Sequence, residues 1–448
     1  MLDFETLVRL VTSTPDDPQI RDAFADPVLD EATIARIVTH LPAESLPIIA
    51  ALLPSERMTE VLSQLDHEDA ARILIELDHA TQVAVIDAMQ PDDAADIIAS
   101  MSEPDRVRII DSMPEDEAQE LAGLLTWQPD TAAALMTPAF VAVSPRLTAD
   151  EAIAGIREVA EEFESVHDVF VVDKEARLIG VLALDALVRA PGTERVSRLM
   201  SGNPVSVRVS EDQESAARVM QDYDVVTMPV VDDNDVLLGV IAHDDMLDVL
   251  EQEATRDIEQ LGGSQPLDLP YRRAGVGVLY SRRVWWLLAL FLAEAYTGTV
   301  LRHYEGEIEQ VVALSFFIPL LIGTGGNVGT QVTTTLVRAM GLHEVSLRDM
   351  RWVFLKEVRV GLLLGATMGV VAFLRAQLLH VGVDIGVVIA VTVLSISIWS
   401  AAVASLLPLA LGKLRVDPAV VSAPVISTLV DGTGLIIYFS IAKFLLHL

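Results

Sequence analysis

The chain of 448 residues contains no cysteine, and basic residues are scarce beside acidic ones, with 31 lysines and arginines against 65 aspartates and glutamates. The absence of cysteine excludes disulfides, zinc–thiolate sites and iron–sulfur clusters. The formal net charge of −34 disfavours nucleic acid as a partner, because phosphates would be repelled, and favours cations. Neither Asp-Lys-Thr-Gly nor Gly-Lys-Ser/Thr occurs, so we expect neither an ATP-driven pump nor an enzyme.

The negative charge is concentrated in the first part of the chain. Residues 1–260 contain 17 basic and 54 acidic residues, whereas residues 261–448 contain 14 and 11. A chain that is 51% hydrophobic can carry this net charge only if the charge is confined to one part. We therefore expect an acidic soluble part followed by a nearly neutral, apolar part. The length also exceeds that of one compact domain. The opening sequence Met-Leu-Asp-Phe-Glu lacks a basic stretch before an apolar run and predicts no cleavable signal peptide.

The apolar part contains five segments long enough to cross a bilayer, which takes roughly 17–25 residues. They are Val284–Val300, Val311–Leu336, a segment centred on Val360–Leu374 that must extend back past Lys356, Ile385–Gly412, and Pro418–Ala442. Arginine and lysine gather in the loops on one side, and acidic or mixed loops lie on the other. This bias predicts an integral protein of the cell (inner) membrane with a cytoplasmic N-terminus and the C-terminus outside. Five buried helices of a soluble protein would not explain the charge pattern.

A twelve-residue period runs through the first part of the chain. An apolar residue followed by a turn-forming or polar residue recurs at Leu41, Leu53, Leu65, Leu77, Met89, Met101 and Met113. Each unit predicts a short helix with acids in its first turn, where the helix dipole favours them. Units this small cannot bury their apolar side alone, so we expect them to stack as a helical solenoid.

A longer repeat follows the short helices. Leu135-Met136-Thr137 recurs as Leu199-Met200-Ser201, and Val171-Val172-Asp173 recurs as Val230-Val231-Asp232. Each copy predicts a strand, an amphipathic helix, two apolar strands and a further helix. This order resembles a tandem pair of CBS domains, which often bind adenine nucleotides.

The resemblance to CBS domains implies a nucleotide contact. The family's ribose-binding aspartate matches Asp245 in the second copy, whereas the first copy has Ala186 at that place and Asp185 one residue earlier. Residues 244–261 then predict an amphipathic acidic helix between these modules and the membrane segments, where a coupling element is expected.

Asp431 lies near the centre of the fifth apolar segment. A carboxylate at mid-bilayer depth costs on the order of 3 kcal/mol or more, so it is a functional candidate. Ser427 and Thr428 lie on the same helix face one turn earlier. These are hard oxygen ligands without histidine or cysteine, which disfavours zinc and copper. A protonated or helix-paired structural aspartate is the alternative.

The second apolar segment contains a glycine-rich polar stretch, Gly323–Gln331. Glycines and polar amides inside a span are costly unless irregular backbone faces water or protein. We therefore expect this stretch to expose carbonyl and side-chain oxygens to a permeating ion. Close helix packing through the glycines is the alternative, but it leaves Asn327 and Gln331 unexplained.

Three sequence segments, together with the order of the modules, resemble those of a known family. They are FFIPLLIGTGGNVGTQ (Phe316–Gln331), PVISTLVDGTGLIIYF (Pro424–Phe439) and DMLDVLEQEATRDIEQLGG (Asp245–Gly263). The chain resembles the MgtE family of magnesium channels over essentially its whole length. The resemblance implies a homodimer in membrane lipid with a central pore for Mg²⁺.

The resemblance also implies site residues. In the pore it places Asp431 and Asn327 on the ion path, to which we add the neighbouring oxygen donors Gly326, Thr428, Gln331 and Glu309. In the cytosolic part it implies Mg²⁺ sensor positions at Asp92, Asp93, Asp96, Asp212, Glu214, Asp224, Asp245, Asp248, Glu253 and Asp257, with Arg256 standing where the family usually has an acid. Mg²⁺ gives up water reluctantly and is usually held by one or two carboxylates plus waters, so one pore aspartate per subunit suits a hydrated ion.

The expected fold is multidomain. An all-α helical-repeat solenoid occupies residues 1–130, α/β tandem CBS domains occupy 131–250 (131–195 and 196–250), an acidic connecting helix and linker occupy 244–270, and an all-α five-helix transmembrane domain occupies 271–448. The expected function is a Mg²⁺-selective channel or transporter that takes Mg²⁺ into the cytoplasm and closes when cytosolic Mg²⁺ binds the acidic modules, with ATP as a further ligand of the CBS domains. The alternatives are a broader Mn²⁺, Co²⁺ and Ni²⁺ secondary transporter, for which Glu294 is the one further intramembrane acid, and a membrane-anchored sensor without transport.

Overall fold

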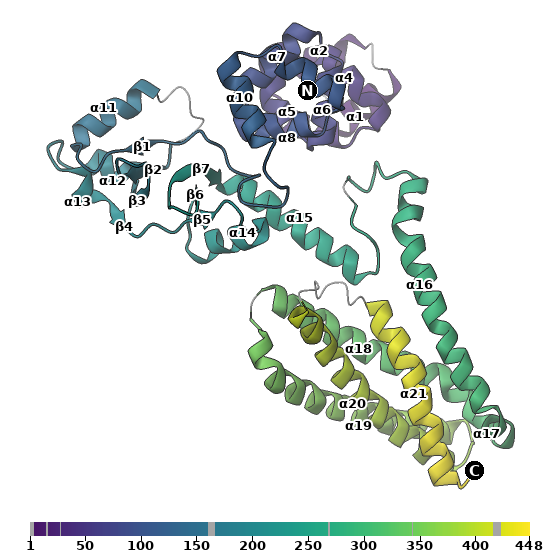
Figure 1. Ribbon diagram of the computed structural model, residues 1–448. Helices are drawn as coiled ribbons and strands as arrows, with labels where there is room; N and C mark the ends of the chain where they lie inside the picture. Colours follow the sequence, from purple (N-terminus) through teal and green to yellow (C-terminus); the bar gives the residue numbers. More distant parts are fainter. Residues whose placement is uncertain are drawn as a thin grey trace. The chain divides into compact units, whose positions relative to one another are not determined.

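The chain forms two compact units, Met1–Glu253 and Ala254–Leu448, joined through one helix (Figure 1). The structure is a computed structural model and describes residues 4–14, 17–26, 28–159, 166–267, 269–342, 344–414 and 423–448.

Short helices make up the first part of the first unit. They are α1 (Phe4–Ser13), α2 (Pro18–Ala25), α3 (Glu31–Thr39), a 3-10 turn (Ala43–Ser45), α4 (Leu46–Leu52), α5 (Ser55–Ser63), α6 (His67–Ile75), α7 (His79–Asp87), α8 (Pro91–Ala99), α9 (Glu103–Ile110) and α10 (Glu115–Leu124). From α5 to α10 each helix begins twelve residues after the previous one. The predicted period is confirmed, and its caps are visible: Asp66 accepts from the Glu68 N–H, and Asp78 accepts from the Thr81 N–H.

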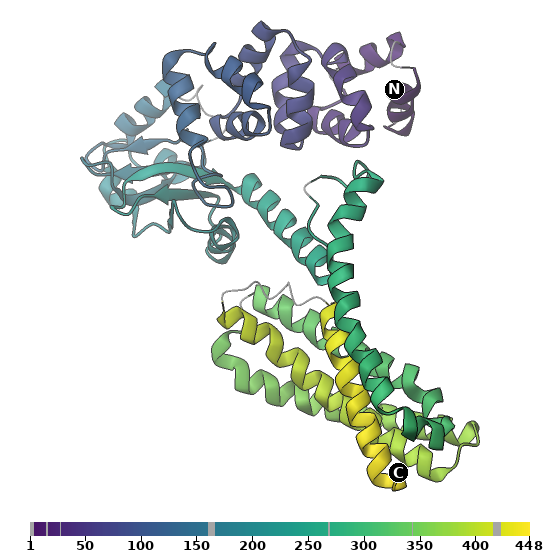
Figure 2. The same cartoon turned by 45° about the vertical axis from the view of Figure 1, so that its right-hand side comes forward.

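Each of these helices packs against the next but one, which gives two rows, α3-α5-α7-α9 and α4-α6-α8-α10 (Figure 2). The apolar residues that mark the period fill the space between the rows; Leu41, Leu53, Leu65, Met89 and Met101 are all buried. The expected solenoid is confirmed, because a single unit of this size has no interior of its own.

Each copy of the longer repeat forms one small sheet. The first copy contains β1 (Ala142–Val143), α11 (Ala149–Val159), β2 (Asp168–Val172), β3 (Leu178–Ala183) and α12 (Leu184–Arg189). The second copy opens with α13 (Val196–Leu199) and β4 (Ser201–Gly202), and β4 pairs with β3 of the first. The second copy continues with β5 (Val207–Arg208), α14 (Gln213–Asp222), β6 (Thr227–Val231) and β7 (Leu237–Ala242). The strand orders are β1-β2-β3-β4 and β5-β6-β7, and in both copies the first strand is parallel and the third antiparallel to the second. The expected CBS pair is confirmed.

The two CBS copies are joined by apolar side chains and by isolated strand bridges. Phe170 of β2 lies in one cluster with Val231, Leu237 and Val240 of the second copy. Backbone bridges link Thr137 to Val240 and Arg177 to Val236. α15 (His243–Leu261) follows β7 directly, as predicted, and runs from the first unit into the second.

In the described part of the second unit, five helices are long and apolar enough to cross a membrane, so the predicted spans are confirmed. Its elements are α16 (Val276–His303), α17 (Glu305–Gln310), a 3-10 helix (Val312–Phe317), α18 (Ile318–Gly341), a 3-10 turn (Leu347–Asp349), α19 (Met350–Leu378), α20 (Val383–Lys413) and α21 (Ala423–Leu446). The part of the fifth predicted span that precedes Ala423 lies outside the described residues. Helices α18, α20 and α21 pack on one another, α19 packs on α20, and α16 packs on α21.

Three glycines at four-residue spacing bring α19 against the backbone of α20. A Cβ at Gly361 would lie 2.9 Å from the Ser397 carbonyl oxygen, one at Gly365 would lie 2.9 Å from the Leu394 Cα, and one at Gly369 would lie 2.9 Å from the Ala390 carbonyl oxygen. Small residues at this spacing allow close helix approach where no hydrophobic effect drives association in lipid.

Gly365→Ala should therefore destabilise the membrane unit, since the added methyl meets backbone that cannot rotate away. We expect a loss of about 1–3 kcal/mol, seen as a lower melting temperature of the full chain in detergent. Gly323→Ala makes the same chemical change where nothing lies within 4 Å and is the matched control. Equal melting temperatures for the two variants would contradict this account of the packing.

Candidate functional site

The glycine-rich stretch of the second span lies wholly within α18, which is unbroken from Ile318 to Gly341. The expectation of irregular backbone is therefore wrong, and α21 is likewise continuous through Gly432 and Gly434. Gly326 allows α21 to approach, because a Cβ there would lie 3.0 Å from the Ser427 Oγ. A Cβ at Gly329 would lie 2.5 Å from the Ile426 Cγ2, so the glycines serve close helix packing.

A polar row nevertheless remains on the outer face of α18. Asn327, Gln331 and Thr334 are all exposed in this chain, and they recur at helical spacing. Amide groups at this depth are costly in lipid. This face of α18 therefore requires water or another protein surface against it.

Asp431 of α21 is half-buried, and its Oδ1 has no hydrogen-bond partner among the described residues. It lies one helical turn after Ser427, the residue that faces Gly326 of α18. Its neighbour Gly432 packs against Tyr296 of α16. Glu294 of α16 is close enough to interact electrostatically with Asp431, so two carboxylates from different helices share this region.

The remaining predicted pore residues lie in two places. Thr428 is half-buried on α21 beside Ser427, and Gly326 is buried at the contact between α18 and α21. Glu309 is exposed on α17, before the second span. Nearby Glu307 accepts a hydrogen bond from the Lys443 Nζ at 3.1 Å. Glu309 thus lies on the short helix that is joined to the end of α21, twelve residues after Asp431.

A group of acidic side chains gathers where α8 of the solenoid meets the start of α15, within the first unit. Burial is the largest cause that raises the pKa of Asp92 to about 7, and repulsion from the Asp93 carboxylate is the second. Burial, followed by repulsion from the carboxylates of Asp92, Asp244 and Asp93, raises the pKa of Asp245 to about 8. We call Asp92, Asp93, Asp96, Asp244, Asp245 and Asp248 the acidic cluster.

Two further members of the acidic cluster behave in the same way. Burial raises the pKa of Asp96, which His67 opposes from 3.6 Å, and burial raises the pKa of Asp248, with Glu251 and Asp244 adding to the effect. These carboxylates repel one another, and a divalent cation would relieve that repulsion. Among the described residues no three such side chains converge closely enough to hold an ion directly.

The other predicted sensor residues lie apart from the acidic cluster. Asp212 caps α14 by accepting from the Glu214 and Ser215 N–H groups, at 3.0 and 3.2 Å. Glu214 pairs with Arg218, and Glu253 accepts a hydrogen bond from the Gln213 Nε2 at 2.8 Å. Asp224 is exposed in the turn after α14, with φ of 51°. Asp257 belongs to the second unit, where its Oδ2 lies near Gly341 at the end of α18.

A cavity of about 610 Å³ lies in the first unit, mainly on the first CBS copy. It is lined by Val166, His167, Asp168, Ala183, Leu184, Asp185, Val188, Arg189 and Val226. Asp185 pairs with Arg189 at 2.8 Å. Asp245 does not line this cavity; it lies in the acidic cluster, where nucleotide phosphates would be repelled.

Sequence reasoning missed Asp244 of the acidic cluster and His67, which lies 3.6 Å from Asp96 of that cluster. His67 begins α6, and Pro91 begins α8 two repeat units later. Since helices two units apart pack together, the twelve-residue period places His67 beside the first turn of α8. The sequence therefore contained the information needed to find His67.

The acidic cluster predicts a pH dependence of stability. The pKa values of Asp92 and Asp245 are raised above the value of about 4 for an unfolded chain. The folded chain therefore binds more protons than the unfolded chain above about pH 4, and the stability present at low pH is lost as pH rises through about 7 and 8. In magnesium-free buffer the melting temperature of the full chain should fall by about 5 °C or more between pH 5.5 and 8.5. Asp245→Asn should flatten this slope, as should saturating Mg²⁺; identical slopes in all three conditions would contradict the prediction.

Parts of the chain match three family models. Residues 318–441 match MgtE, described as a divalent cation transporter, residues 29–130 match the MgtE intracellular N domain, and residues 132–192 and 196–252 match CBS domains. The fold and these matches define the class: a membrane protein with a divalent-cation transporter module and CBS-containing soluble modules.

Two sequence relatives agree with this class. The chain is 42% identical to the magnesium transporter MgtE of Thermus thermophilus over 73% of either chain, and 31% identical to that of Bacillus subtilis over 72% of this chain and 71% of the relative. A solved structure of the cytosolic domain of the Mg²⁺ channel MgtE in complex with ATP is similar, with a TM-score of 0.48 and 32% identity, over 51% of this chain and 93% of that chain. This chain belongs to the MgtE family.

Proposed function

We propose that this protein is a Mg²⁺ channel or transporter of the inner (plasma) membrane, a homodimer that takes Mg²⁺ into the cytoplasm and is closed by Mg²⁺ bound to its first unit. The N-terminus is cytoplasmic and the C-terminus outside, as the loop charges suggest. The domain boundaries are those expected from the sequence, at about residues 130, 195, 250 and 270. Its curated relatives named magnesium transporters support the choice of ion.

Two observations carry this proposal: the Asp431 Oδ1 has no hydrogen-bond partner among the described residues, and a polar row on α18, the helix that packs on α21, is exposed. A second copy packed through this side would enclose Asn327 and Gln331 in a water-filled path, where their cost in lipid disappears. One carboxylate from each subunit would bind a hydrated divalent ion loosely enough to release it.

The acidic cluster supports closure by Mg²⁺. Without a divalent ion its carboxylates repel one another, which favours separation of the solenoid from the CBS pair and α15. A Mg²⁺ ion that binds more tightly when the solenoid lies against the CBS pair and α15 than when they are separated shifts the population toward the closed arrangement. Contacts inside the second unit supply a route to the pore: Asp257 of α15 lies near Gly341 of α18, and the turn at Gly263 approaches Trp286 of α16 and Pro424 of α21.

The CBS cavity supports ATP as a second ligand. His167 and Arg189 can pair with phosphates, Asp185 can accept from ribose hydroxyls, and the exposed Val188 and Val226 can cover an adenine ring. We therefore assign nucleotide binding to the first copy, and to Asp185 in place of Asp245.

A second candidate function is proton-coupled divalent-cation transport that also accepts Mn²⁺, Co²⁺ and Ni²⁺. The interaction of Glu294 with Asp431 favours it, since a second carboxylate is what a proton relay requires.

Ion flux into liposomes containing the full chain tests the two functions. Each divalent ion is offered separately, with and without a pH gradient. Magnesium flux that follows the Mg²⁺ gradient alone supports the channel, flux that requires the proton gradient supports the alternative, and no flux of any divalent ion contradicts both.

A further inference from the structure

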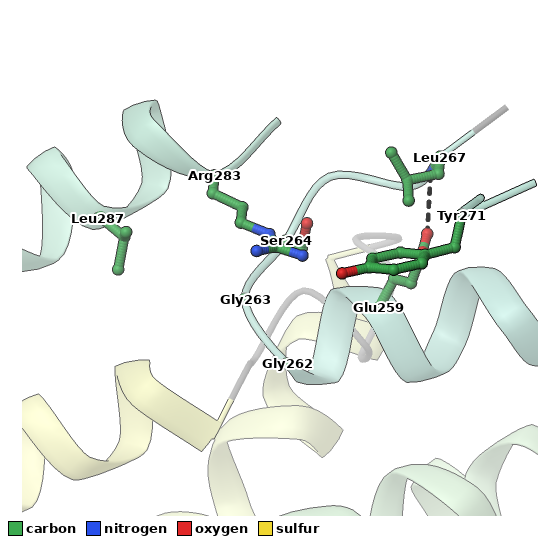
Figure 3. A pocket seen from close by; sticks show the side chains of 8 residues that line it. All are labelled: Glu259, Gly262, Gly263, Ser264, Leu267, Tyr271, Arg283 and Leu287. Carbon is green, nitrogen blue, oxygen red and sulfur yellow. Dashed lines mark hydrogen bonds between the residues drawn. The ribbon is translucent and has the colours of Figure 1, made fainter. Parts of the chain in front are cut away.

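A cavity of about 320 Å³ lies where the end of α15 and the linker after it meet α16, within the second unit (Figure 3). This volume is at the lower end of the range of about 300–1,000 Å³ found for small-molecule sites. The cavity lies at the start of the first membrane span, apart from Asp431 and from the acidic cluster.

The linker that walls this cavity is held in place by specific contacts. The Gln265 N–H donates to the Arg282 carbonyl oxygen at 3.1 Å, and the Leu267 N–H donates to Glu259 Oε2 at 2.7 Å. Gly263 has φ of 76°, and a Cβ there would lie 2.8 Å from the Trp286 Nε1. The cavity is therefore a built feature of this turn.

Its polar lining carries both signs of charge. The Arg283 guanidinium extends toward Ser264 (Figure 3) and has no hydrogen-bond or ion-pair partner among the described residues. Glu259 uses Oε2 to accept from Leu267, which leaves Oε1 available. The Tyr271 ring lies beside the Glu259 carboxylate in the same view. A cation, an anion and an aromatic face thus line one small space.

An apolar track leads away from Arg283 along α16. Arg283, Leu287 and Phe291 are four residues apart and share one helix face. Leu287, which lines the cavity, is 59% exposed, and Phe291 is 75% exposed. Because α16 is long and apolar enough to span a membrane, we expect this exposed face to meet acyl chains. A ligand with a charged head at Arg283 and an apolar tail along Leu287 and Phe291 has the form of a phospholipid.

We propose that this cavity binds the headgroup of a zwitterionic phospholipid with a primary ammonium, that is, a phosphoethanolamine lipid. Its phosphate accepts from Arg283, and from the Ser264 hydroxyl once that group turns from the Gln265 carbonyl oxygen, to which it donates at 3.2 Å. Its ammonium donates to Glu259 Oε1 and lies against the Tyr271 ring. A headgroup with phosphate alone leaves Glu259 facing negative charge, and a choline headgroup has no N–H to donate.

Native mass spectrometry of the full chain in detergent tests the proposal, with phosphatidylethanolamine, phosphatidylcholine and phosphatidylglycerol of identical acyl chains. Phosphatidylethanolamine should bind most tightly. Arg283→Gln should weaken that binding roughly tenfold, the effect expected for loss of a charged hydrogen bond. Arg351→Gln removes the same charge from an exposed position of α19 outside the cavity and should change nothing.

The Glu259→Gln variant provides a second, independent test of the proposal. Glutamine keeps an oxygen for the Leu267 N–H but loses the negative charge, so the preference for phosphatidylethanolamine over phosphatidylglycerol should shrink. Equal binding of the three lipids by the unmodified chain would overturn the proposal, and so would unchanged phosphatidylethanolamine binding in Arg283→Gln. If soluble phosphoethanolamine competes as well as the lipid does, the ligand is the free headgroup and the lipid assignment is wrong.

Discussion

Asp431→Ala should reduce Mg²⁺ flux into proteoliposomes at least roughly tenfold, because a charged ligand on the ion path is worth on the order of 1.5–3 kcal/mol. Asp431→Asn keeps the shape but loses the charge, and it should lose flux or selectivity as well. The reason is structural: one oxygen of this carboxylate has no hydrogen-bond partner among the described residues.

The control for Asp431 is Asp384→Asn. Asp384 is an exposed acid in the first turn of α20, away from the helix centres. Flux through Asp384→Asn protein should match the unmodified protein, and the melting temperatures of all variants should show that they fold. Normal Mg²⁺ flux through folded Asp431→Ala protein would remove Asp431 from the ion path.

Charge removal in the sensor should leave the pore open at high internal Mg²⁺. For Asp245→Asn, and likewise for Asp248→Asn, Glu253→Gln and Asp257→Asn, the Mg²⁺ concentration that half-closes the pore should rise roughly tenfold, the effect of one lost charged ligand. Flux as a function of Mg²⁺ on the side of the first unit measures this. Asp111→Asn, an exposed acid in the solenoid outside the acidic cluster, should leave the curve unchanged.

A stability measurement separates ligand loss from relief of repulsion. Asp245→Asn removes a carboxylate whose pKa is raised by burial and by its acidic neighbours, so the magnesium-free chain should melt at a higher temperature than the unmodified chain. Its further stabilisation by Mg²⁺ should be smaller, because one ligand is gone. A variant that melts higher and also closes at lower Mg²⁺ would show that charge dilution, not bound ion, drives closure.

The helical period and the membrane spans follow from the sequence because each depends on local information. Asp66 and Asp78 fix where α6 and α7 begin by capping them, and an apolar run of sufficient length predicts a span wherever it occurs. The long acidic helix after β7 is also local, since its periodicity is its own.

The glycine-rich stretch shows where local information ends. Gly325, Gly326 and Gly329 are compatible with either broken backbone or close packing, and the choice depends on Val430, Ser427 and Ile426 of a distant helix. In the same way, the meeting of Asp92 with Asp245 depends on the packing of the solenoid against the CBS pair, which neither repeat predicts. Asp92 and Asp245 are both predicted from the sequence as Mg²⁺ sensor positions, but the sequence does not predict that these two side chains lie close together.

Mg²⁺ flux into proteoliposomes, measured while free Mg²⁺ is varied on the side of residues 1–260, tests the account most directly. The driving gradient is held constant, and a parallel series replaces the added Mg²⁺ with K⁺ at matched ionic strength. Flux should be high at low Mg²⁺ and should fall as Mg²⁺ rises, whereas K⁺ should have far less effect, because screening weakens repulsion without bridging carboxylates. Flux that is absent, or that responds equally to Mg²⁺ and K⁺, would contradict a Mg²⁺ pore closed by its own acidic unit.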